Sequence, residues 1–292
     1  MILKHPKARL ELSCGRYTLD LDKRVHVMGI LNITPDSFSD GGAYFNNTEK
    51  SLLRAEEMAR DGAGIIDIGG ESTRPGSSAV SVDEELDRVI PVIKALSGRI
   101  DIPISIDTAK SEVARAAVEN GASIVNDVTG LRGDPEMASV VARSGAGLII
   151  MHMKGSPKTM QVEPFYKDLI GEIIESLRES IAIAVGAGVP QDKIVVDPGI
   201  GFGKTVRHNL TILNRLSEFK SLGRPIMAGV SRKSFIGAVL NSPVNERLIG
   251  TVAAASVAIM NGARMIRVHD TKELVDAARI VDAIMREGEE PA

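Results

Sequence analysis

Hydrogen-bonding and ionisable residues recur at the ends of short apolar runs in this sequence. Eight such runs are separated by stretches with the apolar spacing of helices. If the run ends meet in space, they surround a ligand rich in hydrogen-bonding groups, because buried polar groups need partners. The residues at or just after these ends are Asn32, Asp67, Asp107, Asn126, Met151, His152, Asp197, Ser231, Lys233, Ser234, Arg267 and His269.

The chemistry of this set divides by charge. Asp107, Asn126 and Asp197 offer acceptors and one amide, which suit a flat heterocycle with several N–H donors, such as an aminopyrimidinone edge. Arg267 and His269, with a lysine at 233, offer positive charge that suits phosphate. The residues alone predict a polar heterocycle joined to a phosphorylated group, and they leave the reaction open.

A divalent cation fits the same set. Asn32 offers a neutral oxygen to a hard cation such as Mg²⁺, which tends to arrive with phosphate oxygens and water. The alternative for any one residue is that barrel carboxylates and amides only pair with each other or cap the next helix. Asp127 fits that alternative, and so does Asp67, because a carboxylate beside Gly69 and Gly70 can accept from nearby backbone N–H groups.

Two long loops rich in glycine and serine follow the first two runs, at residues 34–42 and 71–78. Their composition predicts mobile lids that exclude water, and the apolar Phe38 inside a polar loop favours this interpretation. The alternative is a pair of plain surface turns.

The elements that position these residues follow a recurring phrase, in which a helical stretch ends in a Gly-Ala or Ala-Gly pair and an apolar run follows. Glycine adopts the left-handed conformation that ends a helix, and a buried strand begins a few residues later. The pairs stand at Gly62-Ala63, Gly121-Ala122, Gly145-Ala146, Ala187-Gly188 and Gly262-Ala263.

Eight strands alternating with helices predict an α/β fold with parallel pairing and both sheet faces covered. Eight units in about 260 residues favour a closed (β/α)₈ TIM barrel, with an open doubly wound sheet as the alternative. In such a barrel the active site lies at the C-terminal ends of the strands, where the polar residues stand. The predicted strands are residues 25–32, 65–68, 102–107, 123–126, 148–151, 194–197, 225–230 and 265–268.

The first segment differs, because residues 8–23 alternate around Cys14-Gly15-Arg16. This pattern predicts an N-terminal β-hairpin that caps the lower mouth of the barrel. We expect a single domain over residues 1–292, with its core at about 25–285 and a frayed tail after Gly288. Cys14, the one cysteine, is expected to be a packing residue.

Composition excludes several classes of protein. The chain has 292 residues, 43% hydrophobic and 25% charged, with a formal net charge of −3. No basic face indicates nucleic acid, and no apolar run is long enough to predict a membrane span. One cysteine permits no internal disulfide, and the start lacks the apolar run of a secretion signal. We therefore expect a cytoplasmic protein that binds small molecules.

Two long stretches carry a resemblance to a known family. Residues 28–42 read MGILNITPDSFSDGG, and residues 69–76 read GGESTRPG. Together with the shorter blocks that follow, in the same order and spacing, they resemble dihydropteroate synthase from about residue 25 to 285. These blocks are Ser105–Thr108, Asn126-Asp127, Met151–Met153, Asp197–Lys204, Ser231–Ser234 and Arg267–Asp270.

The resemblance implies that 4-aminobenzoate is joined to (7,8-dihydropterin-6-yl)methyl diphosphate, with release of diphosphate, in folate biosynthesis. It implies four functional groups of residues. Asp107, Asn126, Met151, Asp197 and Lys233 bind the pterin; Asn32, Thr73, Arg74, Arg267 and His269 bind the diphosphate, with Mg²⁺ at Asn32; Phe38, Pro75, Phe202 and Ser234 bind 4-aminobenzoate; Asp36, Lys233, Arg267 and His269 are catalytic.

Two alternative functions are considered beside this one, and the resemblance also bears on assembly. A corrinoid-dependent methyltransferase also needs a pterin pocket, but residues 72–76 and 231–234 argue for diphosphate and aminobenzoate sites that it lacks. A binding protein without catalysis would have lost loop residues, and none is lost. The resemblance further implies a homodimer through helices near the C-terminal strands.

Overall fold

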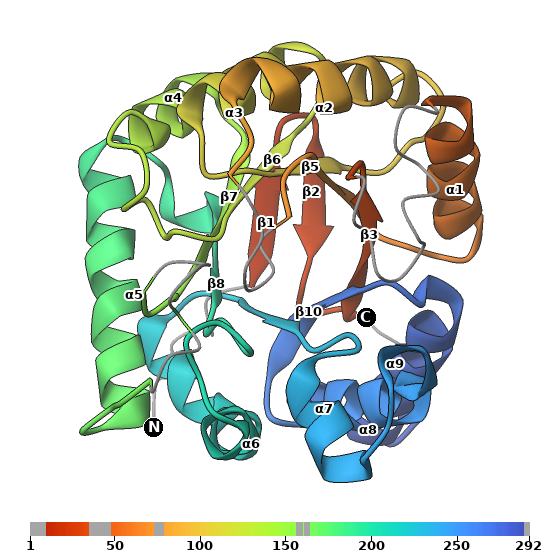
Figure 1. The fold of residues 1–292 in the computed structure, drawn as a ribbon, viewed down its shortest axis with the longest axis vertical. Coiled ribbons are helices and arrows are strands. Elements are labelled where there is room, and N and C mark those ends of the chain that lie inside the picture. Colours follow the sequence, from red (N-terminus) through yellow and green to blue (C-terminus); the bar gives the residue numbers. More distant parts are fainter. Residues whose placement is uncertain (1–9, 35–47, 73–78, 156–159, 161–163, 289–292) are drawn as a thin grey trace, which may run out of the picture.

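The structure, a computed structural model, describes residues 10–34, 48–72, 79–155, 160 and 164–288. Eight parallel strands close into a barrel in the order β10-β3-β4-β5-β6-β7-β8-β9, and a separate antiparallel pair forms from β1 and β2. Helices surround the barrel (Figure 1). The predicted (β/α)₈ barrel is therefore confirmed, and the open sheet is excluded because β10 pairs with β3.

Each barrel strand overlaps one of the predicted apolar runs, and most of its residues are buried because both sheet faces are covered. The runs are hydrophobic at nearly every position rather than at alternate ones, which is the pattern of a parallel sheet. The strands are β3 (His26–Asn32), β4 (Ile65–Gly69), β5 (Ile104–Asp107), β6 (Ile124–Asp127), β7 (Gly147–Met151), β8 (Ile194–Asp197), β9 (Ile226–Gly229) and β10 (Ala263–Val268).

The helices pack one apolar face on the barrel. In α2 the Ser81 side chain accepts a hydrogen bond from the Glu84 backbone N–H, which caps the first turn. The α-helices are α1 (Thr48–Arg60), α2 (Val82–Leu96), α3 (Ser111–Glu119), α4 (Met137–Ser144), α5 (Leu169–Gly186), α6 (Val206–Asn214), α7 (Ser234–Leu240), α8 (Leu248–Met260) and α9 (Thr271–Met285). The 3₁₀ helices are η1 (Gln191–Lys193), η2 (Leu216–Leu222) and η3 (Val244–Glu246).

The Gly-Ala and Ala-Gly phrases end helices as expected. Gly145 is the left-handed C-cap of α4, with φ of 70°. Gly62, Gly121, Gly188 and Gly262 also have positive φ. Glycine is the one residue that adopts this conformation without a steric penalty. These positions therefore fix where each helix ends and where the chain turns toward the next strand.

The N-terminal hairpin is also confirmed, as β1 (Glu11–Cys14) and β2 (Tyr17–Asp20). Its buried residues, which include Leu12, Cys14 and Leu19, form one cluster with inward-facing residues of the barrel strands such as Met28 and Ile149. The hairpin thus covers one end of the barrel, and Cys14 is a packing residue whose pKa burial raises to about 12. No helix among the described residues is long and apolar enough to cross a bilayer.

Asp127, at the end of β6, shapes the turn that follows. One carboxylate oxygen accepts from the Thr129 backbone N–H at 2.8 Å and from its hydroxyl at 2.7 Å, and the other accepts from the Leu131 N–H at 2.8 Å. Leu131 has φ of 66°, a conformation unfavourable for leucine. Asp127 is absent from the cavity described below, so its structural role is the one expected of a turn-capping carboxylate.

We predict that Asp127→Asn destabilises the protein by about 1–3 kcal/mol, because an amide nitrogen would face one of these backbone donors and leave it unsatisfied. The free energy of unfolding in urea, followed by circular dichroism, measures the effect. An unchanged value would contradict a structural role for this carboxylate.

Candidate active site

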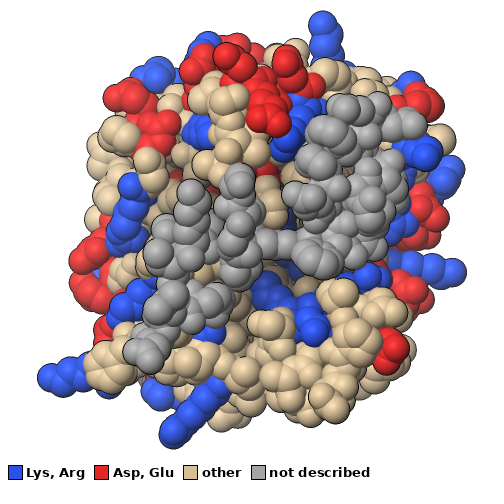
Figure 2. Space-filling model, in the orientation of Figure 1, with Lys and Arg blue, Asp and Glu red and all other residues tan. Residues whose placement is uncertain are grey.

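A cavity of about 630 Å³ opens at the C-terminal ends of the barrel strands. Every described residue to which the resemblance assigns a role lines it, so the strand ends do converge. In the view of Figure 2, lysine and arginine side chains gather near the centre of this face, next to α7. The predicted residues in the lining are Asn32, Asp107, Asn126, Met151, Asp197, Phe202, Lys233, Ser234, Arg267 and His269.

The remaining predicted residues cannot be located in this cavity. Asp36 and Phe38 of the first predicted lid lie outside the described residues, as do Thr73, Arg74 and Pro75 of the second. The expectation that these two loops are mobile lids falls on the same segments.

Hydrogen-bond acceptors form one side of the cavity. Asp107 and Asn126 are partners in the register of β5 with β6, and Asp197 is the partner of Met151 in β8 and β7. The Oδ1 atoms of Asp107 and Asn126 are buried and accept no hydrogen bond within the described part of the chain. A buried acceptor that makes no hydrogen bond lowers stability, so these two oxygens are available to the N–H donors of a ligand.

Arg267 anchors this side from β10. Its Nε donates to Asp67 at 2.5 Å and its Nη2 to Asp107 at 2.7 Å. Asn126 Nδ2 also donates to Asp67, at 3.2 Å. Asp67 is fully buried, and its contacts are with these two side chains rather than with the backbone N–H groups expected from the nearby glycines.

Asp67 therefore pairs with other barrel side chains, as one of the expected structural alternatives has it, and not with the backbone beside the glycines. Its importance lies in pairs 200 and 59 residues apart in the chain, which no local pattern predicts. Asp107 is affected by the same charges. Burial raises the pKa of Asp107 to about 7, Arg267 opposes this rise by favouring the charged form, and the charge of Asp67 adds to it. Asp107 thus holds a carboxylate that a ligand with N–H donors, or a proton, can satisfy.

Lys233 lies near Asp197, in the turn between β9 and α7. Its ammonium donates to the Ile200 carbonyl and lies 4.5 Å from the centre of the Phe202 ring. Burial lowers the Lys233 pKa to about 8, although Asp197 favours the charged form. Burial also raises the pKa of Asp197, which Lys233 opposes. Lys233 thus lies between Asp197, which is predicted to bind the pterin, and Phe202, which is predicted to bind 4-aminobenzoate.

Glycine at position 201 allows this close approach. Its φ is 86°, and a Cβ there would lie 2.9 Å from Lys233 Cδ. A larger residue would both strain the backbone and displace the lysine. The chain between β8 and α6 therefore forms the wall against which Lys233 packs.

His269 is oriented by Ser231 across the ends of β10 and β9. The Ser231 hydroxyl accepts from the His269 backbone N–H at 3.2 Å and lies 2.9 Å from its ring Nδ1. Ser231 thus contacts both the backbone and the ring of His269, which holds the ring in place. Arg232 pairs with Asp270 at 2.9 Å and further ties the two loops together.

His152, which the sequence placed in the polar ring, has a structural role instead. It is not in the lining, and its Nδ1 lies 3.0 Å from Lys204 Nζ. Lys204 also donates to the Phe202 carbonyl at 2.9 Å. Burial lowers the His152 pKa to about 2, so the ring is neutral and accepts from the lysine. This bond joins the loops after β7 and β8.

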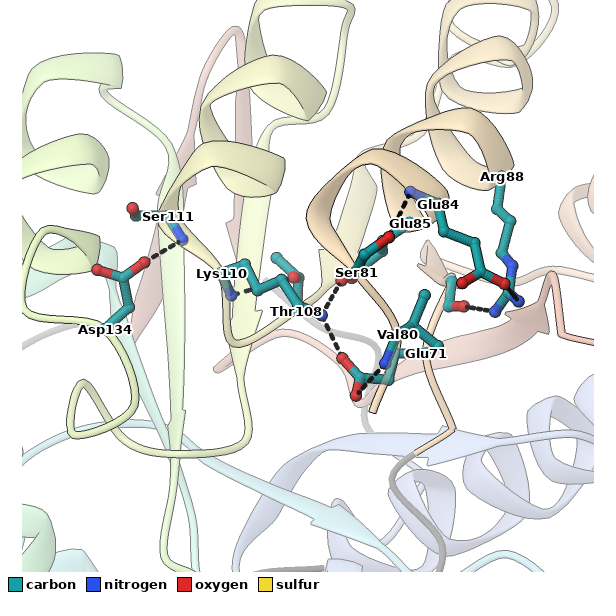
Figure 3. A network of polar contacts seen from close by, with 11 residues as sticks. Glu71, Val80, Ser81, Glu84, Glu85, Arg88, Thr108, Lys110, Ser111 and Asp134 are labelled. Atoms are coloured by element: carbon teal, nitrogen blue, oxygen red, sulfur yellow. Dashed lines mark hydrogen bonds and ion pairs between the residues drawn. The ribbon is translucent and has the colours of Figure 1, made fainter. Parts of the chain in front are cut away.

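A second network that the sequence did not predict surrounds Lys110, three residues after the end of β5 (Figure 3). Lys110, before α3, donates to Glu71 and to Glu85, and Glu85 is fully buried on α2. Burial opposes the charge of Lys110, but these two carboxylates raise its pKa above the usual value. Glu71 also accepts from the Val80 backbone N–H at 3.2 Å. The network thus joins residue 71, the first residue of the second predicted lid, to residue 80, just after its end.

The donor set also limits the kind of metal site. No group of three or more His, Cys, Asp or Glu side chains among the described residues could hold a metal ion. Asn32 lines the cavity together with Arg267 and His269. One neutral oxygen beside anion-binding groups fits Mg²⁺ that takes most of its ligands from phosphate and water, as the ion usually does.

Comparison with known proteins agrees with this geometry. Residues 28–269 match the family described as pterin binding enzyme. The dihydropteroate synthase of Synechocystis is 48% identical over 276 residues, which cover 94% of this chain and 95% of that protein.

Two solved structures are similar over nearly the whole chain. The Yersinia pestis dihydropteroate synthase in complex with a sulfonamide drug has a TM-score of 0.92 and 46% identity, covering 95% of this chain and 100% of that chain. The Clostridium difficile dihydropteroate synthase in the presence of pteroic acid has a TM-score of 0.86 and 50% identity, covering 92% and 99%. This chain therefore belongs to the dihydropteroate synthase family of pterin-binding enzymes.

Proposed function

We propose that this protein condenses (7,8-dihydropterin-6-yl)methyl diphosphate with 4-aminobenzoate, releasing diphosphate and forming 7,8-dihydropteroate in folate biosynthesis. The observation that carries the proposal is one cavity in which buried acceptors of Asp107 and Asn126 have no partner among the described residues, together with the cations Arg267 and Lys233. A donor-rich ring joined to an anionic group satisfies both sets. Pteroic acid, present with the Clostridium difficile relative, contains the pterin and aminobenzoate parts of such a product.

The pterin ring is proposed to lie on the acceptor side. Asp107, Asn126 and Asp197 accept from its N–H groups, Met151 packs against it, and Lys233 donates to an acceptor on the ring. Each of these side chains lines the cavity, and the three acceptors are at most 7% exposed. Ring binding therefore removes the cost of the unpaired acceptors, which gives the site its selectivity for a donor-rich ring.

Arg267 and His269 are proposed to bind the diphosphate and to offset the charge that grows on it as the C–O bond breaks. Thr73 and Arg74 are proposed to join them. Asn32 would hold Mg²⁺, which supplies further charge neutralisation at the leaving group when bound. Asp36 is proposed to stabilise the positive charge on the methylene carbon and the pterin ring.

The 4-aminobenzoate is proposed to bind against Phe202, Lys233 and Ser234, with Phe38 and Pro75 completing its pocket. The C–O bond to diphosphate breaks first and leaves a cation delocalised into the pterin ring. The amine lone pair then forms the new C–N bond to the methylene carbon, and the amine proton is released to solvent or to the diphosphate. The arylamine is a weak nucleophile, so the site contributes position and exclusion of water rather than a strong base.

Assembly into a homodimer is proposed for the face formed by α8 and α9, which pack on each other. Large apolar side chains are exposed there: Ile249 at 78%, Met260 at 60%, Ile280 at 64% and Ile284 at 63%. A cluster of this kind on the surface is typical of an interaction site.

Purified protein mixed with the two substrates is expected to form dihydropteroate and diphosphate in equal amounts. Lys233→Ala is expected to lose most of this activity with little change in melting temperature. The low pKa of Lys233 means that folding disfavours its charged form, so removal relieves a cost rather than losing core packing. Near-normal turnover in this variant would contradict the proposed position of both substrates.

Aminobenzoate is expected to bind tightly only when diphosphate, or a pterin diphosphate, and Mg²⁺ are present. Isothermal titration of 4-aminobenzoate should show strong binding with diphosphate and Mg²⁺, and weak binding after EDTA or without diphosphate. In Asn32→Ala the dependence on Mg²⁺ should shift to higher concentration, by roughly tenfold for one lost ligand. Tight binding to the bare enzyme would contradict the coupling.

Sedimentation is expected to give twice the 31.1 kDa mass of one chain. Ile249→Glu should shift the mass toward that of one chain without loss of helical signal, because the new charge would be buried in the dimer but solvated in the monomer. A wild-type protein that sediments as one chain at micromolar concentration would contradict this assembly.

A further inference from the structure

Asp67 lies beneath the floor of the cavity and receives two of the side chains that form it. Its side chain is 0% exposed, and it is not part of the lining. The single oxygen Oδ2 accepts from Arg267 Nε at 2.5 Å and from Asn126 Nδ2 at 3.2 Å. Asp67 therefore touches no ligand, but it contacts a residue proposed to bind diphosphate and one proposed to bind the pterin.

The first consequence concerns the plane of the Arg267 guanidinium. Nε and Nη2 are the two nitrogens of one edge of that group, and both are held, by Asp67 and by Asp107. These two hydrogen bonds, together with the covalent attachment of the group at Cδ, determine its plane and leave Nη1 on the opposite side. An arginine held in this way keeps its orientation without a ligand and loses little entropy on binding an anion.

The second consequence concerns the amide of Asn126, which can present either its oxygen or its nitrogen to the cavity. Since Asp67 is a carboxylate that only accepts, Nδ2 faces it, and Oδ1 remains as the second polar atom. That Oδ1 is buried and has no partner among the described residues. The amide is thus fixed as an acceptor for the ligand.

We propose that Asp67 is a positioning residue that fixes the guanidinium of Arg267 and the amide of Asn126, and thereby selects a ring with N–H donors joined to an anion. The proposal deepens the function proposed above and depends on it. Loss of Asp67 leaves both side chains in place but frees Arg267 to turn and Asn126 to present its nitrogen. Both changes act on the pterin diphosphate and not on 4-aminobenzoate.

Steady-state kinetics of Asp67→Asn tests this division between the substrates. The KM for the pterin diphosphate is expected to rise by about 10- to 100-fold, the size of losing hydrogen bonds to a charged group, and kcat to fall at least about tenfold. The KM for 4-aminobenzoate, measured at saturating pterin diphosphate, should stay within about threefold.

The matched control is Asp127→Asn, a change of another fully buried carboxylate, on the strand two positions from β4 in the barrel. It should lower the melting temperature and leave both KM values unchanged, because Asp127 bonds only to the turn after β6. If Asp67→Asn changes the kinetics no more than Asp127→Asn does, or affects both substrates alike, the positioning role is wrong.

A double-mutant cycle identifies whether Asp67 acts through Asn126. If it does, Asp67→Asn should raise the KM for the pterin diphosphate less in the Asn126→Ala background than in the wild type, because only the effect through Arg267 remains there, so the two effects are not additive. Additive effects would remove Asn126 from the proposal.

Neutron diffraction from the wild-type crystal decides the same point without any variant, should Asp67→Asn fail to fold. Deuterium on the Asn126 atom that faces Asp67 is expected, and an oxygen in that position would overturn the inference. Failure of the wild type to form dihydropteroate would instead overturn the proposed function, so the two failures are distinguishable.

Discussion

The ion pairs of Arg267 with Asp67 and Asp107 are the constraint on which the rest of the site depends. All three groups lie in the upper barrel, where water is scarce and an unpaired charge is costly. Two carboxylates share one guanidinium, so the negative charge is not fully compensated. Burial raises the Asp107 pKa to about 7, and the charge of Asp67 adds to that rise while Arg267 opposes it. The site therefore favours a ligand that brings donors.

The barrel makes this arrangement possible because it brings distant residues to one level. Arg267 and Asp67 are 200 residues apart, yet closure of β10 on β3 places their strands near each other. Parallel strands end on the same side, so their C-terminal residues form a ring above a packed interior. The hairpin fills the opposite end, where Leu12 and Cys14 pack on inward-facing strand residues. The polar groups of the site are thereby gathered at the other end of the barrel.

The sequence predicted the elements better than the contacts between them. Apolar runs and left-handed glycines depend on local chemistry, so the eight strands and the hairpin were found, and Asp127 was recognised as a turn cap. The partner of Asp67 depends on strand register across the closed barrel, which no local pattern contains. His152 was placed with the ring because it follows a strand end, but the chain there turns it toward Lys204. Strand position identifies candidates, and side-chain direction decides among them.

The unpaired oxygens show how binding and stability oppose each other in this site. Asp67, Asp107 and Asn126 each keep one buried oxygen without a partner in the described structure, and each such oxygen lowers the stability of the unliganded protein. A ligand that donates to the Asp107 and Asn126 oxygens removes that cost on binding, so part of its affinity comes from a penalty already present. The oxygen of Asp67 is out of the ligand's reach, and its cost persists in the complex. Stability alone would favour an apolar residue at position 67. The presence of a buried carboxylate there is explained by its effect on Arg267 and Asn126.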